Sequence, residues 1–401
     1  MRLFLALPSL ALGAVLKYPA AEAAQVSAQL SVKKPPRVAQ SHRLAAAAGN
    51  RNFTPSAHGT LRAGEPEARL IEIYRLIGEA RGSDALVRAL GDVPDTQTMA
   101  AAAVLADLRE ESRLRLKALR EYPPSGSIPT QFLSLSPKTR HAIAVDAATS
   151  RLYLFENSAS ALKLIADFYI SIGKSGTEKT LEGDQHTPLG VCYITSNLNP
   201  TSLNDYYGAG ALPINHPNPL DISRGKTGCG IWLHETPPGQ FARAPKASDG
   251  CVVLVHPDLE RIIRTVEART TPVVIVQPLH WAPPHSVRAD SQAFEVALRG
   301  WRTATTSGDL AQVLSYYSPD FRSFNKTLQE WTPAPRNEIA GAKGRDIDLK
   351  DLSFLRRTDS SDVMVAAFGE VVGGAQTGLV KRQCGVRRGA QWKIFFEGVI
   401  G

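Results

Sequence analysis

The residues best suited to chemistry in this chain are a histidine and a cysteine placed 17 positions apart. His234 ends an apolar run that starts at Gly230, and Cys251 opens a second apolar run that continues to Leu254. If the two runs form neighbouring strands, their ends meet, as a thiol and the imidazole that activates it require. Gly250 lets the backbone turn sharply and present N–H groups to a carbonyl oxygen. The spacing therefore predicts a nucleophilic cysteine at the ends of two adjacent strands.

The elements that must position this pair are short, β-prone runs separated by turns. They predict a mainly-β region with strands near 142–146, 151–155, 165–172, 191–195, 230–233, 251–255 and 273–276. Between residues 197 and 221 lies a long stretch rich in Asn, Pro, Tyr and Gly, which predicts a lid or, alternatively, a disordered insertion. Its candidate substrate contacts are Tyr206, Tyr207 and Asn215, for which simple packing is the alternative.

Two motifs in this region resemble the L,D-transpeptidase catalytic domain family. The first is a histidine, a spacer of this length, and then Ser-x-Gly-Cys, here Ser248 to Cys251. The second is Gly183-Asp184 followed by Thr187-Pro188-Leu189-Gly190. The resemblance extends from about Thr139 to Gln277, and it implies a mainly-β catalytic domain, which we place at residues 136–279.

The resemblance also implies a mechanism. Cys251 would attack the L,D bond after the third residue of a peptidoglycan stem peptide, with His234 as general base lowering the effective pKa of the thiol. The main-chain carbonyl of Glu235 would orient the imidazole, and the N–H groups of Gly250 and Cys251 would hold the oxyanion. A thioester forms and is resolved by an amine or water, with no metal or other cofactor.

The chain departs from the family at three positions. Glu235 stands where Gly or Ser is common, Asp249 replaces a histidine, and Val253 replaces an arginine that provides a fixed cation for a substrate carboxylate. The sequence leaves open which residue replaces that arginine: Arg243, Lys246 or Arg224. Besides the three lid residues, the candidate substrate contacts are Ser248, Asp249 and Arg243.

The chain before the catalytic region has three parts. Arg2, the apolar stretch up to Leu16 and the Ala21-Glu22-Ala23 triplet are typical of a secretory signal peptide at residues 1–24, with an N-terminal core helix or an uncleaved anchor as alternatives. This predicts export to the periplasm or cell envelope. Residues 25–65 predict a disordered tether. Residues 66–121 predict a small α-helical module, used either for self-association or as a spacer.

The last region, at residues 288–401, has a helical pattern followed by β-like runs, which predicts an α+β domain. With the preceding regions, this order resembles the branch that contains the cell-shape-determining L,D-carboxypeptidases, whose final domain is similar to nuclear-transport-factor-2-like cones. Aromatic residues along this region predict a packed core, with a ligand cavity as the alternative; they are Trp301, Tyr316, Tyr317 and Phe321.

Composition limits the other classes of function. The 401 residues carry a net charge of +8, but Lys and Arg are scattered, so nucleic acid is not an expected partner. No Cys-x-x-Cys or His-Glu-x-x-His spacing occurs, which disfavours zinc. Cys192, Cys229 and Cys384 are expected to be buried small hydrophobes, with a Cys192–Cys229 disulfide left open.

Together these observations predict an exported, peptidoglycan-modifying cysteine enzyme of the L,D-transpeptidase type. An L,D-carboxypeptidase that trims tetrapeptide to tripeptide and a non-catalytic wall-binding scaffold are the alternatives. The enzyme hypothesis predicts that iodoacetamide modifies Cys251 faster than the other cysteines near neutral pH.

Overall fold

The computed structural model describes residues 121–399, with gaps at 160, 204–209, 237–242, 343, 359–361 and 376–377, and eight residues between 107 and 118. Those eight residues are helical. The predicted signal peptide, the tether and the rest of the helical module at 66–121 lie outside the described residues, as do Tyr206 and Tyr207. No helix in the described part is long and apolar enough to cross a bilayer.

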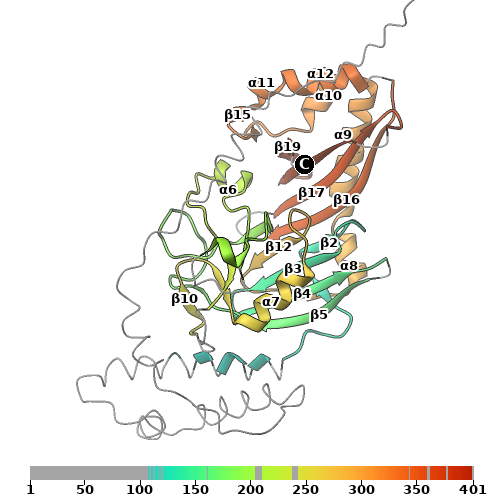
Figure 1. Ribbon diagram of the computed structural model, residues 1–401. Helices are drawn as coiled ribbons and strands as arrows, with labels where there is room; N and C mark the ends of the chain where they lie inside the picture. The colour runs from blue at the N-terminus through green and yellow to red at the C-terminus, as the bar shows by residue number, and fades with distance from the viewer. Residues whose placement is uncertain are drawn as a thin grey trace, which may run out of the picture. The chain divides into compact units, whose positions relative to one another are not determined.

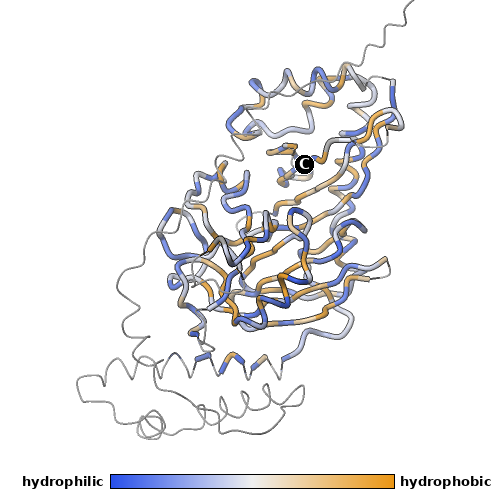
Figure 2. Tube along the Cα trace, viewed as in Figure 1, coloured by the Kyte–Doolittle hydropathy of each residue, from blue (hydrophilic) through white to orange (hydrophobic). Residues whose placement is uncertain are grey.

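The central region, predicted to be catalytic, is built on a five-stranded sheet with the order β5-β4-β3-β12-β7. Strand β12 runs parallel to β3 and antiparallel to β7. Because side chains alternate along each strand, Ile143 and Val145 enter one apolar cluster, while Ala142 and Ala144 enter another on the opposite face. Figure 2 shows apolar residues along these strands. The strands are β3 (His141–Asp146), β4 (Arg151–Asn157), β5 (Leu162–Tyr169), β7 (Gly190–Tyr193) and β12 (Pro272–Val276).

Smaller sheets complete the mainly-β region and position His234 and Cys251. A three-stranded sheet has the order β11-β9-β8, with β8 (Ala211–Pro213), β9 (Trp232–Glu235) and β11 (Val252–Leu254). Strand β10 (Lys246–Ser248) pairs with β6 (Ile172–Gly173). Helix α7 (His256–Thr265) follows β11 directly and buries Leu259 and Ile262.

The stretch predicted as irregular between 197 and 221 contains regular elements instead. They are the 3-10 helix η2 (Pro200–Ser202), strand β8 and helix α6 (Pro219–Ser223). Helix α6 begins with a capping box in which Asn218 and Asp221 bond each other's backbone N–H, and Pro219 occupies the first helical turn. The long-loop interpretation is therefore wrong for these residues.

The C-terminal region has the predicted α+β order, with helices before long antiparallel strands (Figure 1). One face of α9 (Gln292–Ser307) buries Phe294, Leu298 and Trp301 against the sheet. Tyr317 and Phe321 are also in this core, and Tyr316 packs against it, as the core interpretation predicts. The other elements are α8 (Pro284–Ala289), α10 (Leu310–Ser315), β14 (Arg322–Ser323), β15 (Lys326–Thr327), α11 (Leu328–Trp331), α12 (Pro333–Ala342), β16 (Ile347–Thr358), β17 (Asp362–Val372), β18 (Leu379–Arg388) and β19 (Gln391–Val399).

The C-terminal sheet includes one strand from the beginning of the described chain. Its order is β19-β18-β17-β16-β2, and β2 (Phe132–Ser134) precedes the whole catalytic region. Likewise, β1 (Ile128–Pro129) pairs with β13 (Trp281–Ala282). Buried Arg357 of β16 approaches Asp221 of α6 at 3.2 Å. The two regions therefore share strands and a buried ion pair.

Candidate active site

The register of two parallel strands brings the histidine and cysteine together. Val253 of β11 lies opposite His234 of β9, so residues 251 and 234 are on the same side of the sheet. Two residues before His234, the backbone N–H of Trp232 points at the sulfur of Cys251, with 3.4 Å between the nitrogen and the sulfur. The thiol is 3.5 Å from the Gly230 carbonyl oxygen. The structure thus joins the ends of the two runs, as their spacing predicts.

The imidazole of His234 is buried and held in one orientation. Its Nδ1 lies 2.8 Å from the main-chain oxygen of Glu235, the carbonyl that the family resemblance implies. With the Nδ1 proton on that carbonyl, Nε2 is the nitrogen able to accept a proton. Burial lowers the pKa of His234 to about 4, and the charge of Arg243 acts in the same direction. At neutral pH the ring is a neutral base.

The thiol of Cys251 is also uncharged in this arrangement. Although the residue keeps some solvent exposure, the packed protein around its sulfur raises the pKa of Cys251 to about 11. The Trp232 N–H and the charges of Arg243 and Lys179 oppose this rise without cancelling it. The raised pKa differs from the expected lowering of the thiol pKa, so the sulfur carries its proton at neutral pH in this arrangement.

The side chain of Glu235 points away from the reacting pair. Neighbouring residues of a strand project to opposite faces, so its carboxylate lies on the other side of β9 from His234. There its Oε2 is 2.5 Å from Nδ1 of His256, at the start of α7. The carboxylate of Glu235 therefore lies away from the imidazole of His234.

The backbone before the cysteine forms a tight turn that requires glycine. Gly250 has φ +124°, and a Cβ there would lie 2.7 Å from the carbonyl oxygen of His186. The carbonyl oxygen of Gly250 accepts a 2.8 Å hydrogen bond from the buried hydroxyl of Thr187. The same hydroxyl accepts the Gly173 N–H at 2.9 Å. Thr187 therefore fixes the turn that precedes Cys251.

Ser248 bonds within this turn. Its hydroxyl accepts the Gly250 N–H at 3.1 Å and donates to the Cys251 carbonyl oxygen at 2.6 Å. The side chain is buried. The Gly250 N–H, a predicted oxyanion donor, is thus bonded within the turn, and Ser248, a predicted substrate contact, supports that turn.

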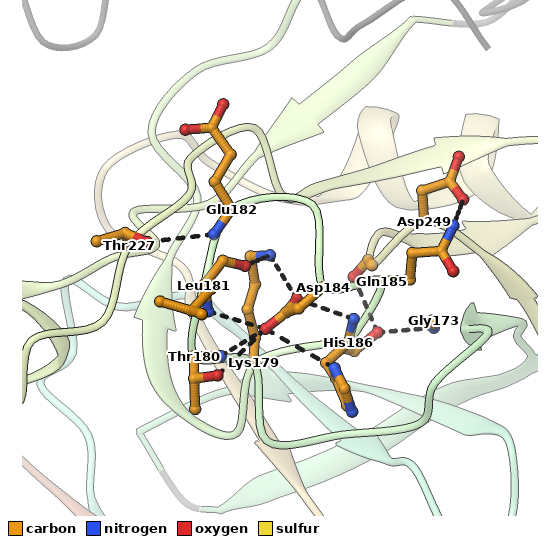
Figure 3. Close-up of polar contacts among 12 residues, drawn as sticks. Gly173, Lys179, Thr180, Leu181, Glu182, Asp184, Gln185, His186, Thr227 and Asp249 are labelled. Carbon is orange, nitrogen blue, oxygen red and sulfur yellow. Dashed lines mark hydrogen bonds and ion pairs between the residues drawn. The ribbon is translucent and has the colours of Figure 1, made fainter.

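A second turn, centred on Asp184, braces the first (Figure 3). Its carboxylate accepts hydrogen bonds from the N–H groups of Thr180, Leu181 and His186 at 2.7, 2.9 and 3.1 Å, and from Lys179 Nζ at 2.9 Å. Burial alone would raise the pKa of Asp184, but these donors hold it well below its usual range. Asp184 thereby shapes the segment whose His186 carbonyl approaches Gly250.

Sequence reasoning assigned no role to Asp184 or Thr187. The available signal was their position in the Gly-Asp and Thr-Pro-x-Gly motifs, which lie far from the cysteine along the chain.

The remaining predicted substrate contacts, Asp249, Asn215 and Arg243, each bond to different parts of the protein. Asp249 is exposed, and its Oδ1 accepts from Lys174 Nζ at 3.0 Å and from the side-chain amide of Gln185 at 3.1 Å. Asn215 accepts the Tyr193 N–H at 2.6 Å and holds strand β7. Arg243 donates to the Ala247 carbonyl oxygen at 2.6 Å.

All four cysteines are unpaired, so no Cys192–Cys229 disulfide forms. Cys192 and Cys384 are buried as expected, whereas Cys229 is exposed.

Comparison with known families decides the class of this region. Residues 140–275 match the family described as the L,D-transpeptidase catalytic domain. The central region is an L,D-transpeptidase catalytic domain. Members of this family are typically cysteine enzymes that modify peptidoglycan. No curated protein matches the sequence.

Solved structures share the fold over most of the described chain. Bd1075 of Bdellovibrio bacteriovorus is 21% identical, with a TM-score of 0.57 over 68% of this chain and 99% of that one. Pgp2, a helical cell shape determining protein of Campylobacter jejuni, is 19% identical, with a TM-score of 0.54 over 72% of this chain and 99% of that one. The folds of the central and C-terminal regions thus occur together in other proteins.

Proposed function

We propose that this protein is a cysteine enzyme that cleaves the L,D bond after the third residue of peptidoglycan stem peptides. The observation that carries the proposal is the placement of His234 and Cys251 on one side of two adjacent parallel strands inside the L,D-transpeptidase domain. The carbonyl of Glu235 leaves Nε2 of His234 as the proton acceptor. A thiol and a neutral base in this order form an acyl-transfer site.

Attack and proton transfer occur together in this proposal. The Cys251 sulfur bonds to the substrate carbonyl carbon while its proton passes to His234 Nε2. The Cys251 N–H is the remaining predicted donor to the oxyanion, because the Gly250 N–H is bonded to Ser248. Collapse breaks the C–N bond, and the amine of the D-amino acid leaves with the proton from His234. The product is a thioester on Cys251.

Water is the acceptor that we propose for the thioester. His234 removes a proton from the water as it attacks, and the thiol recovers it when the C–S bond breaks. This gives an L,D-carboxypeptidase, as the branch resemblance implies from the order of the regions in the sequence. An amine that attacks in place of water would give a crosslink or an exchange product.

The purified protein incubated with disaccharide tetrapeptide tests this function by mass spectrometry of the products. We expect disaccharide tripeptide and free D-alanine from the wild type, and neither from Cys251→Ala. Cys229→Ala is the matched control, because it removes an exposed thiol outside the catalytic pair. Crosslinked dimers would make the enzyme a transpeptidase. An identical lack of products from all three proteins would favour the wall-binding scaffold.

We propose further that the protein acts outside the cytoplasm, since residues 1–24 have the pattern of a signal peptide. Cell fractionation with mass spectrometry of the N-terminal peptide tests this. A cytoplasmic protein that retains Met1 would contradict export. Self-association through the helical module stays a second proposal, tested by the molar mass of the full chain in solution.

A further inference from the structure

Position 253, where the resemblance implies an arginine, holds a valine in this chain. Val253 is buried in β11, and its backbone N–H and C=O pair with Ser171 at 2.8 and 2.9 Å. The Ser171 hydroxyl accepts the Ala247 N–H at 3.2 Å. The Ala247 carbonyl oxygen in turn accepts the Arg243 guanidinium. Arg243 is therefore tied, through two short segments, to the strand position that lacks the arginine.

The other two candidates for this cation are Lys246 of β10 and Arg224 at the C-terminal end of α6. Lys246 is exposed on β10. Arg224 caps the C-terminal end of α6, where its N–H bonds carbonyl groups of that helix. By contrast, the charge of Arg243 acts on both reacting groups: after the larger effects of burial, it lowers the pKa of His234 and that of Cys251.

The guanidinium of Arg243 has unused capacity for hydrogen bonding. One terminal nitrogen donates to Ala247, but Nε is buried and has no hydrogen-bond partner. An unpaired buried donor costs free energy that a bound anion recovers. Carboxylates match the planar fork of a guanidinium and accept two N–H groups at once.

We propose that Arg243 binds the terminal carboxylate of the leaving D-amino acid and so restricts the enzyme to stem peptides with a free C-terminus. This inference rests on the proposed function and adds the group that selects the substrate. A guanidinium that is linked through Ala247 and Ser171 to the strand after Cys251 suits a carboxylate on the leaving side of the bond. Arg243 replaces, from a loop, the cation that the family takes from the strand.

The helix that precedes the catalytic region holds Arg243 in place. The carboxylate of Glu111 accepts the Arg243 N–H at 2.9 Å, and the Tyr169 hydroxyl donates to the Arg243 carbonyl oxygen at 2.8 Å. Arg115 connects the two supports, with an ion pair to Glu111 at 2.8 Å and its guanidinium 4.1 Å from the Tyr169 ring centre. Glu111 is thus a positioning residue for the carboxylate site.

Two substrates that differ only at the C-terminus test the proposal: disaccharide tetrapeptide with a free carboxylate, and its carboxamide. We expect the wild type to prefer the free acid by about 10- to 100-fold in kcat/KM, the range for a hydrogen-bonded charge. Arg243→Gln should bring the ratio of the two kcat/KM values close to one, because it lowers kcat/KM for the substrate with the free carboxylate. Arg243→Lys, which keeps the charge but not the fork, should retain part of that preference. Arg264→Ala, an exposed arginine on α7, should leave it unchanged.

Glu111 variants separate positioning from general support of the fold. Glu111→Ala should lower the acid preference several-fold, and Glu111→Gln, which keeps an acceptor for the Arg243 N–H, should restore most of it. A wild type without acid preference, or Arg243→Gln that slows both substrates equally, would overturn the proposal. If Arg243→Gln does not fold, the preference of Arg243→Lys decides. A wild type that cleaves neither substrate refutes the proposed function itself, and the inference with it.

Discussion

The catalytic site and the interior of the C-terminal region both bury ionisable groups, with opposite results. His234 and Cys251 lie in packed surroundings that favour their neutral forms. Lys381 is also buried, but Glu338, Glu370 and Glu397 surround its Nζ at 2.7, 3.2 and 3.6 Å. These carboxylates raise the pKa of Lys381 well above its usual value although burial alone would lower it.

The comparison teaches that burial alone does not determine charge. A buried group without a strong counter-ion loses its charge and stays ready to exchange a proton, as catalysis requires. A buried group with counter-ions keeps its charge and becomes a fixed support. The first arrangement should control rate and the second stability.

His234→Ala should break the catalytic side of this comparison and give the largest effect. Without a base to accept the thiol proton, we expect kcat to fall about 10³- to 10⁴-fold, close to the upper range for general base catalysis. Steady-state assays on disaccharide tetrapeptide measure this. Thermal unfolding should show that the variant is folded; an active variant would exclude His234 as the base.

Lys381→Met tests the other half of the comparison, the buried charge cluster of the C-terminal region. It leaves Glu370 and Glu397 buried without their cation, and we expect the free energy of unfolding to fall by about 3–5 kcal/mol, measured in urea. Adding Glu370→Gln to Lys381→Met should recover part of the loss. Activity per folded molecule at low temperature should be unchanged, and a selective loss of kcat would contradict a purely supporting role.

The depressed pKa of His234 should appear in the pH dependence of stability. The unfolded chain binds a proton near pH 6.5 and the folded one only near pH 4. Stability should therefore be complete above pH 6.5 and fall by roughly 3 kcal/mol as the pH drops to 4. The difference between the wild type and His234→Gln isolates this part, because other groups titrate in both. Equal slopes would contradict the neutral, buried ring.

The rate of alkylation tests whether the buried thiol of Cys251 is neutral in the free protein. Because the pKa of Cys251 is raised to about 11, its thiolate fraction at neutral pH should be about 100-fold below that of an ordinary cysteine. Iodoacetamide should therefore modify exposed Cys229 first, which reverses the order expected from the sequence. Peptide mapping after timed labelling measures both rates, and preferential labelling of Cys251 in the free protein would indicate a preformed ion pair.

Thr187→Val should have the smallest effect. It keeps the shape but removes the hydroxyl that joins Gly250 to Gly173, so the turn before Cys251 loosens. We expect kcat to fall about tenfold, which corresponds to roughly the free energy of one or two hydrogen bonds. Thr195→Val is the matched control, since its hydroxyl bonds Pro213 away from the turn. Equal kcat values for the two variants would remove Thr187 from the positioning machinery.

The sequence predicted what depends on local pattern. The strands around His234 and Cys251 follow from apolar runs, and their adjacency follows from the short connection between them. The capping box at Asn218 and Asp221 was also local, and it could have located α6 within the stretch predicted as a loop.

Features that depend on distant partners were not predictable in this way. Arg357 pairs with Asp221, which lies 136 positions away in the chain. The positive charge of buried Lys381 is explained by three carboxylates from other parts of the chain. The use of the Gly250 N–H depends on the orientation of the Ser248 side chain. Such contacts arise from tertiary packing, which periodicity and spacing do not encode.

The placement of β2 in the C-terminal sheet has a consequence for synthesis. Ser136, just after β2, bonds Ser353 of β16, 217 positions later in the chain. At about 5–20 residues per second, a ribosome needs on the order of 10–40 s to make the intervening chain. During that time the early strand has no partner from its own sheet, while the strands of the L,D-transpeptidase domain are already complete. A gene cut between the two regions would therefore separate β2 from β16, its partner in the C-terminal sheet.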